Sequence, residues 1–363
     1  MWFTAKREIL LNGIQIVENI INAKTTLPIL SNILIETQQD TLRLTATDLN
    51  IGISCVIPVD IKEQGAITIP AKRFNDIIRE LSADTVEINT KKNNLINIET
   101  QLCQFKVMGL IKDDFPKLPE FKNKEVIKIE QEGLKQLLSR TSFVVSFNEV
   151  RYVLNGILFL VNKDKLTLVS TDGKRLAIAE KKITQNLNQD ISIIVPIKTI
   201  YELNRNLKDS GELSIILSNN QVLFDLGDVV IISRLIEGEF PDYHQVVPAV
   251  SNIKFKINRE QFLLAIKRAA LLSTVDYQAV KLEVFKNKLV VSKSTPDVGE
   301  SREELNIEYD GKEIVVGFNA NYLMDVLKNL TLDVIEFELV SSEKPGVIRA
   351  DNYVYIVLPM CLG

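Results

Sequence analysis

Apolar residues occur along the chain in four kinds of segment, and these segments return in the same order three times. The first kind is an amphipathic stretch with apolar residues three and four positions apart, the spacing of one helix face. It occupies residues 4–21, 131–145 and 258–272. Its apolar stripes are Leu10, Ile14, Val17 and Ile21; Leu134, Leu137, Leu138 and Thr141; and Phe262, Ile266 and Ala269 or Ala270. The pattern predicts three helices.

The other three kinds of segment are rich in strand-forming residues. The second is a strand, a turn and a strand, and the third is a short strand followed by a second helix. The fourth is a strand pair that ends at a proline. They begin or end at matching positions: Leu42, Leu166 and Leu289 for the second; Ile67, Ser192 and Glu313 for the third; Pro116, Pro241 and Pro359 for the fourth.

The spacing of the matching positions indicates one structural unit repeated three times. Thr47 and Thr171 are 124 positions apart, and Phe115 and Phe240 are 125 apart. Self-similarity with a constant period is the signature of repeated architecture. We therefore expect three domains, at residues 1–124, 125–249 and 250–363.

The overall composition is consistent with several globular domains. The 363 residues are 46% hydrophobic and 25% charged, which is typical of soluble globular proteins. No apolar run reaches the length of a membrane span, and the N-terminus lacks a signal-peptide core. Three scattered cysteines suggest a reduced, cytoplasmic protein, and with a single histidine, His244, they make a metal site improbable.

Charge is unevenly distributed although the net value is only −4. The predicted helices carry lysine and arginine off their apolar stripes, whereas acidic residues are denser in strands and loops. Such segregation is typical of a positive face that holds a polyanion, although ordinary solvated helix faces would give the same pattern. The basic residues are Lys6, Arg7, Lys72, Arg73, Arg79, Lys135, Arg140, Lys198, Arg205, Lys208, Arg259, Lys267, Arg268 and Lys328.

The sequence offers little support for catalysis. The stretch from Ser170 to Arg175 resembles part of a phosphate loop, but Leu168 stands where the first glycine is required. A turn between two strands explains the same residues, and Asp48 takes the equivalent place in the first repeat. His244 and Cys361 lack a third group to orient them. A hydrolase that uses Asp48 or Asp172, and an adaptor that binds only proteins, remain as rival functions.

The C-terminal segment, residues 353–363, is a predicted strand that continues into an apolar tail. Chain ends are usually polar and frayed. The tail is therefore either tucked into its own domain or part of a pocket, for which methionine is an adaptable lining.

Six motifs resemble one known family over the whole chain. They are TLPILSNILIE from Thr26, LTATDL from Leu44, EVRYVLNGILF from Glu149, STDGKRLA from Ser170, EGEFPDY from Glu237, and the closing VLPMxL from Val357. Together they resemble the bacterial sliding clamps, the beta subunits of DNA polymerase III. The resemblance implies an α+β fold of three DNA-clamp domains, each with two helices packed on antiparallel sheets. It also implies a head-to-tail homodimeric ring around double-stranded DNA, without catalytic activity, metal or cofactor.

The resemblance further implies a cleft, between the second and third domains, that binds short peptides of partner proteins. The partners would be the polymerase III alpha subunit, the clamp loader, other polymerases and repair proteins. Lys174, Gln245 and Cys361 depart from the residues common in the family, which puts the polar rim in question. The implied cleft residues are Leu154, Thr171, Gly173, Lys174, Arg175, Leu176, Pro241, Val246, Ile356, Val357, Leu358, Pro359, Met360 and Leu362.

Two other sets of residues follow from the resemblance. The first set would contact DNA, and in this region Val153 replaces an aromatic residue often seen beside Tyr152. The second set would form the subunit interface, where acidic residues near Glu300, Glu303 and Glu304 would face a basic edge. The DNA candidates are Lys24, Lys72, Arg73, Asn148, Tyr152 and Lys198. The interface candidates are Arg73, Leu110, Leu271 and Leu272.

Overall fold

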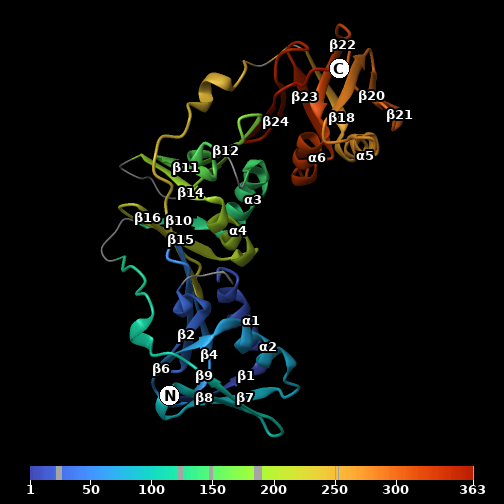
Figure 1. Cartoon of the computed structure of the whole chain (residues 1–363). Helices are drawn as coiled ribbons and strands as arrows, with labels where there is room; N and C mark the ends of the chain where they lie inside the picture. The colour runs from blue at the N-terminus through green and yellow to red at the C-terminus, as the bar shows by residue number, and fades with distance from the viewer. Residues whose placement is uncertain are drawn as a thin grey trace. The chain divides into compact units, whose positions relative to one another are not determined.

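The computed structural model describes residues 1–21, 27–121, 126–146, 150–183, 190–249, 251 and 253–362 (Figure 1). These residues form two compact units. Unit 1 comprises Met1–Glu132 and Lys198–Leu235, and unit 2 comprises Gly133–Ile197 and Ile236–Gly363.

Unit 1 contains two antiparallel sheets. Its larger sheet has the strand order β10 (Val126–Glu130), β15 (Glu212–Ser218), β16 (Gln221–Asp225), β17 (Val229–Arg234), β4 (Ile51–Pro58), β3 (Thr41–Thr47), β2 (Asn32–Gln38) and β6 (Ala66–Pro70). Its smaller sheet has the order β5 (Asp60–Glu63), β1 (Trp2–Lys6), β7 (Thr85–Thr90), β8 (Leu95–Glu99) and β9 (Gln104–Met108).

Unit 2 repeats this organisation. Its larger sheet has the order β14 (Ile191–Pro196), β11 (Gly156–Asn162), β12 (Lys165–Thr171), β13 (Arg175–Lys182), β25 (Tyr353–Val357), β24 (Gly346–Ala350), β23 (Val334–Leu339) and β18 (Ile253–Asn258). Its smaller sheet has the order β21 (Gly299–Asn306), β20 (Lys288–Thr295), β19 (Ala279–Phe285) and β22 (Ile314–Asn319).

Six α-helices lie within the described residues and bury their apolar stripes. They are α1 (Arg7–Glu18), α2 (Ala71–Glu80), α3 (Gln131–Thr141), α4 (Ile197–Asn206), α5 (Arg259–Ala270) and α6 (Ala320–Asn329). In the orange and red part of Figure 1, α5 and α6 lie together against strands of unit 2. Helices packed on antiparallel sheets confirm the α+β fold class.

The predicted first helix was too long at its N-terminal end. The segment 4–6 belongs to β1, where Phe3 and Ala5 are buried and their neighbours are not, which is the two-residue period of a strand. At the other end Ile20 is buried, whereas Ile21 is only half-buried. The helix proper keeps the predicted stripe of Leu10, Ile14 and Val17.

Each larger sheet is continuous across a predicted domain boundary. In unit 1, β4 of the first repeat pairs with β17 of the second, from Val229 opposite Cys55 to Ser233 opposite Ile51. In unit 2, β13 of the second repeat pairs with β25 of the third, from Arg175 opposite Val357 to Ala179 opposite Tyr353. The domain bounds drawn from the sequence stay a prediction, because each sheet contains strands of two predicted domains.

The Thr-Asp turns have the same hydrogen bonds in the first two repeats. The Thr47 hydroxyl donates to the Ile51 carbonyl at 2.9 Å, and the Asp48 carboxylate accepts from the Ile51 amide at 2.8 Å. The equivalent bonds of Thr171 and Asp172 are 2.7 Å and 3.0 Å long. Side chains that cap their own backbone stabilise tight turns. These bonds agree with the interpretation of the Thr-Asp motif as a turn between two strands.

Candidate functional site

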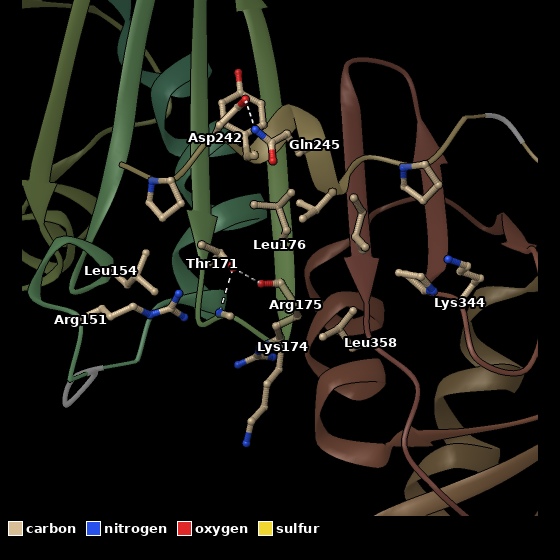
Figure 2. Close-up of a pocket in the computed structure, with 17 residues that line it drawn as sticks. Arg151, Leu154, Thr171, Lys174, Arg175, Leu176, Asp242, Gln245, Lys344 and Leu358 are labelled. Carbon is tan, nitrogen blue, oxygen red and sulfur yellow. Dashed lines mark hydrogen bonds between the residues drawn. The ribbon is translucent and has the colours of Figure 1, made fainter. Parts of the chain in front are cut away.

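A cleft of about 480 Å³ lies on the larger sheet of unit 2 (Figure 2). Ligand sites in proteins commonly measure about 300–1,000 Å³. Residues of both the second and third repeats line the cleft. They are Arg151, Leu154, Thr171, Gly173, Lys174, Arg175, Leu176, Pro241, Asp242, Tyr243, Gln245, Val246, Pro248, Lys344, Pro345, Ile356 and Leu358.

The turn between β12 and β13 forms one wall of the cleft. Gly173 has a φ of +81°, a conformation that side-chain-bearing residues rarely adopt. A Cβ atom at this position would also collide with the Arg151 guanidinium. The Thr171 hydroxyl accepts the Gly173 amide at 3.0 Å, which completes the turn. Glycine therefore suits the backbone conformation of this turn, whereas the flexible Arg151 side chain could move away from an added Cβ atom.

Arg175 fixes that wall to the third repeat. Its guanidinium donates to Asp172 at 2.9 Å, to Asp325 of α6 at 2.7 Å and to the Phe143 carbonyl at 3.0 Å. It also lies 4.4 Å from the centre of the Tyr322 ring. Charge-assisted bonds of this kind are the stronger ones in proteins. Arg175 is thus engaged within the protein and serves as a structural link across the domain junction.

The floor of the cleft is apolar and well packed. Leu154, Leu176 and Ile356 are buried, and Leu176 and Ile356 belong to a larger cluster of buried apolar residues in this sheet. Val246 and Leu358 remain 55% and 44% exposed, so their side chains are available to a ligand. An apolar floor with accessible apolar walls suits the side chains of a peptide.

The polar rim of the cleft is mainly cationic. Arg151, Lys174 and Lys344 are exposed around the apolar floor, with Lys344 on the side of the C-terminal strands in Figure 2. Asp242 accepts hydrogen bonds from the Gln245 side chain at 3.0 Å and from the His244 amide at 3.1 Å. These bonds, with the Gln245 bond the stronger influence, lower the pKa of Asp242.

Ten of the fourteen expected cleft residues line the cavity, and four do not. Val357 is fully buried in β25, and Pro359, Met360 and Leu362 are not among the lining residues. The Met360 amide donates to the Gly317 carbonyl at 2.8 Å, which ties the tail to β22. Both interpretations of the tail therefore hold in part, because Leu358 faces the cleft while Met360 is tied to its own domain.

Sequence reasoning missed several lining residues. Arg151 stood inside a recognised motif, Asp242 and Tyr243 follow the proline already selected, and Gln245 was noted only as a departure. Lys344 and Pro345 carried no signal, because pairing between distant strands brings them to the cleft, and Pro248 lies two residues after Val246. The strand pairing shows that Gln221, which lines the matching cavity of unit 1, is at the position equivalent to Pro345.

That matching cavity is smaller, at about 230 Å³. Gly52 stands where the cleft has Leu176, because the two pair with Thr47 and Thr171 respectively. A Cβ on residue 52 would lie 2.5 Å from Cδ2 of Leu118. The linker side chain of Leu118 thus fills the space over the glycine. This contact explains why the cavity over Gly52 is smaller than the cleft over Leu176.

Comparison with known proteins identifies the family. The family models of the N-terminal, central and C-terminal domains of the DNA polymerase III beta subunit match residues 1–119, 128–242 and 244–361, respectively. The chain belongs to the DNA polymerase III beta subunits, the beta sliding clamps. It therefore contains three clamp domains and functions as a non-catalytic processivity factor of DNA polymerase III.

Individual relatives cover the full chain. The beta sliding clamp of Chlamydia pneumoniae is 32% identical over 363 residues, which is 100% of this chain and 99% of that protein. The crystal structure of the DNA polymerase sliding clamp from Bacillus subtilis matches with a TM-score of 0.96 at 30% identity, covering both chains completely. A Pseudomonas aeruginosa sliding clamp bound to griselimycin has the same TM-score and coverage at 33% identity.

The expected DNA contacts of this sliding clamp are placed only in part. Lys24 and Asn148 lie outside the described residues. Lys72 and Arg73 are exposed on α2, and Tyr152 is 66% exposed. Lys198 on α4 donates to the Asp48 carboxylate at 2.5 Å, so its charge is already partly neutralised within unit 1.

The expected interface residues fall in separate units. Arg73 and Leu110 belong to unit 1, where both are exposed. Leu271 and Leu272 belong to unit 2, where Leu271 is 78% exposed and Leu272 is half-buried. Arg73, Leu110 and Leu271 thus expose much of their side chains, which leaves them available for a subunit contact.

Within the described residues, no group of three or more histidine, cysteine or acidic side chains could hold a metal ion. The three cysteines are free, and burial raises the pKa of the Cys55 thiol to about 11. No helix in the described part of the chain is long and apolar enough to cross a membrane.

Replacing Arg175 by methionine is expected to lower the free energy of unfolding by about 3–5 kcal/mol, because Asp172 would keep a buried charge without its partner. Urea unfolding of the full chain measures the effect. The matched control is Lys254→Met, whose exposed pair with Glu336 should contribute less than about 1 kcal/mol. Equal losses in the two variants would contradict the structural role of Arg175.

Proposed function

We propose that two copies of the chain join head to tail into a cytoplasmic ring that encloses double-stranded DNA. The ring slides without reading base sequence and holds the polymerase near its template. Rebinding of a tethered polymerase is effectively intramolecular, so the ring raises processivity without tight DNA binding. The observation that carries this proposal is the repeated strand pairing between domains.

Two strand edges support ring closure. Among the described strands, β9 of the first repeat and β21 of the third each have a neighbour on one side only. Their counterparts at the two internal junctions are paired, as β17 with β4 and β25 with β13. An unpaired edge strand is a template for pairing with another chain. A contact between β21 and the partner's β9 would repeat the internal junction and use one head-to-tail interface.

The repeat also gives the register of this contact. Thr295 pairs with Gly299, so Gly299 takes the place of Gly52 and Leu176. The Gly109 amide donates to the Asn94 carbonyl, and the Leu235 amide donates to the Asn220 carbonyl, so Gly109 and Leu235 are equivalent. Six residues earlier along the chain, Cys103 therefore takes the place of Val229. Because Val229 lies opposite Cys55, we expect Arg302 opposite Cys103 of the partner subunit.

The exposed basic side chains of the helices fit a channel for DNA. Phosphate contacts from lysine and arginine position a duplex without sequence information. Lys72 and Arg73 are exposed on α2 and would contact phosphates. Tyr152 would stack on a base or sugar, and Lys198 would act together with Asp48. Lys24 and Asn148 complete the proposed set. A net charge of −4 is compatible with this function if the positive charge is concentrated in the channel.

We assign partner binding to the cleft of unit 2. Its apolar floor and the accessible Val246 and Leu358 would accept apolar side chains of short peptides from the polymerase alpha subunit, the clamp loader and other polymerases or repair proteins. A relative from Pseudomonas aeruginosa is bound to griselimycin, and we propose that this compound binds the cleft of unit 2 and can serve as its probe.

Retention on circular DNA tests the ring. After loading by a clamp loader, the protein should remain on a nicked circle and leave when the circle is cut, because a ring can slide off free ends. Gel filtration of the DNA before and after cutting measures this. Continued binding to linear DNA would refute the topological function, because it would show binding that does not need a closed circle. Failure to load at all would also refute it and would favour an adaptor that binds only proteins.

Cross-linking tests the register. The substitution Arg302→Cys should form a disulfide with the native Cys103 of the partner subunit, because opposite Cα atoms in a sheet lie about 4.5–5.5 Å apart. Non-reducing electrophoresis should show covalent dimers. Glu304→Cys lies two residues along the strand, about 7 Å away, and should cross-link poorly. Equal yields from the two variants would show that the register is different.

Trimming the cleft tests its role. The double substitution Val246→Ala and Leu358→Ala should weaken griselimycin binding at least tenfold, because two accessible apolar walls are lost. Isothermal titration calorimetry gives the affinity. Val315→Ala, which removes a partly exposed side chain on β22, is the control. An unchanged affinity in the double variant would place the binding site elsewhere.

A further inference from the structure

Lys293 of β20 is buried in an unusual way for a lysine. Its relative exposure is 5%, and its ammonium group donates to the carbonyls of Tyr277 and Ala279, each at 2.7 Å. No ion pair of Lys293 occurs among the described residues, and burial lowers the pKa of Lys293. A buried charge without a carboxylate is costly unless hydrogen bonds compensate it. The hydrogen bonds to these two carbonyls show that Lys293 holds the backbone at Tyr277 and Ala279 in place.

Both carbonyls lie at the end of the loop between α5 and β19. At the start of this loop, the Thr295 hydroxyl donates to the Leu272 carbonyl at 2.6 Å. Within it, the Thr274 amide donates to the Tyr277 carbonyl at 3.2 Å. Two side chains of β20, two residues apart, thus attach the loop to the sheet at both ends.

The same loop carries apolar side chains that nothing covers within unit 2. Leu271, Val275 and Tyr277 are 78%, 88% and 47% exposed. Close by, Arg268 of α5 is paired with Glu303 of β21, the strand with the open edge. A patch of exposed apolar residues beside an open strand edge fits a protein contact, and its loop must keep one conformation to fit well.

The second repeat secures its equivalent strand differently. Val169 takes the place of Lys293 there, because Thr171 and Thr295 are matching residues two positions later. Val169 is fully buried in an apolar cluster, and Val153 of the preceding loop packs against that cluster. The third repeat has exchanged apolar packing for two directional hydrogen bonds to the backbone. Such bonds define the position of a loop even where its side chains are exposed.

We propose that Lys293 is a positioning residue for ring closure, fixing the loop at residues 271–278 in the conformation that the partner subunit binds. The proposal rests on the head-to-tail ring described above. Ordering a loop during association reduces affinity, and a loop that is already ordered avoids this loss. Lys293 acts through the loop backbone and makes no contact of its own with the partner.

The test compares dimer dissociation with stability in the full-length chain. Lys293→Met retains the length of the side chain and removes the donors, so the dimer dissociation constant should rise about tenfold or more. Amide exchange of residues 273–278 should become faster in the monomer, while the thermal unfolding temperature of the monomer changes little. Sedimentation velocity over a dilution series gives the dissociation constant. Lys281→Met, on the neighbouring strand β19, is the matched control and should leave it unchanged.

A second variant covers the case in which the methionine variant does not fold. Lys293→Gln keeps an amide donor for one carbonyl and should give an intermediate dissociation constant. A folded variant of either kind with wild-type dimerisation would overturn the role of Lys293. If wild-type protein were monomeric at every concentration, the ring itself would fail, whereas a normal wild-type dimer with unaffected variants would refute only the role of Lys293. Leu271→Ala with Leu272→Ala serves as the positive control for loss of the dimer.

Discussion

Antiparallel pairing between strands of successive repeats is the interaction on which the rest of this structure depends. Backbone amides and carbonyls at a strand edge need partners, and here each internal junction supplies them by joining two repeats into one sheet. The cleft of unit 2 lies on such a sheet, so its floor is built from β13 and β25 together. The pairing thereby determines which residues of the third repeat stand beside which residues of the second, and it fixes the register in which Leu176 and Ile356 meet.

Much of this arrangement could be predicted from the sequence, because the repeat appears in residue spacing. The helix stripes, the Thr-Asp turns and the buried floor residues Leu154, Leu176 and Ile356 depend on local pattern or on recognisable motifs. The strand at Thr4–Lys6 was missed because it runs into α1 without a break in the apolar spacing. Lys344 and Pro345 could not be predicted, since only the pairing of distant strands brings them to the cleft. The positions of Lys24 and Asn148 lie outside the described residues and stay untested.

The three Thr-containing turns show how one local structure acquires different functions. Asp48 pairs with Lys198, whereas Asp172 holds Arg175, which reaches Asp325 and the ring of Tyr322. In the third repeat, proline follows the threonine, and the Thr295 hydroxyl bonds the Leu272 carbonyl instead. The first two turns keep the same length, whereas the third is one residue shorter, and the side chains that leave the turns differ in all three. Such divergence gives each of the two internal junctions its own chemistry, while both keep the strand pairing that joins their repeats.

The contact between Gly52 and Leu118 has a consequence for traffic among partner proteins. Because Leu118 of the linker occupies the space over Gly52, the first junction has no cavity at the matching position as large as the cleft over Leu176. Proteins that dock on the same subunit through this cleft must then exclude one another. The order in which they bind would follow from their local concentrations and residence times. A second protein could bind this cleft only after the first dissociates or moves to the other subunit.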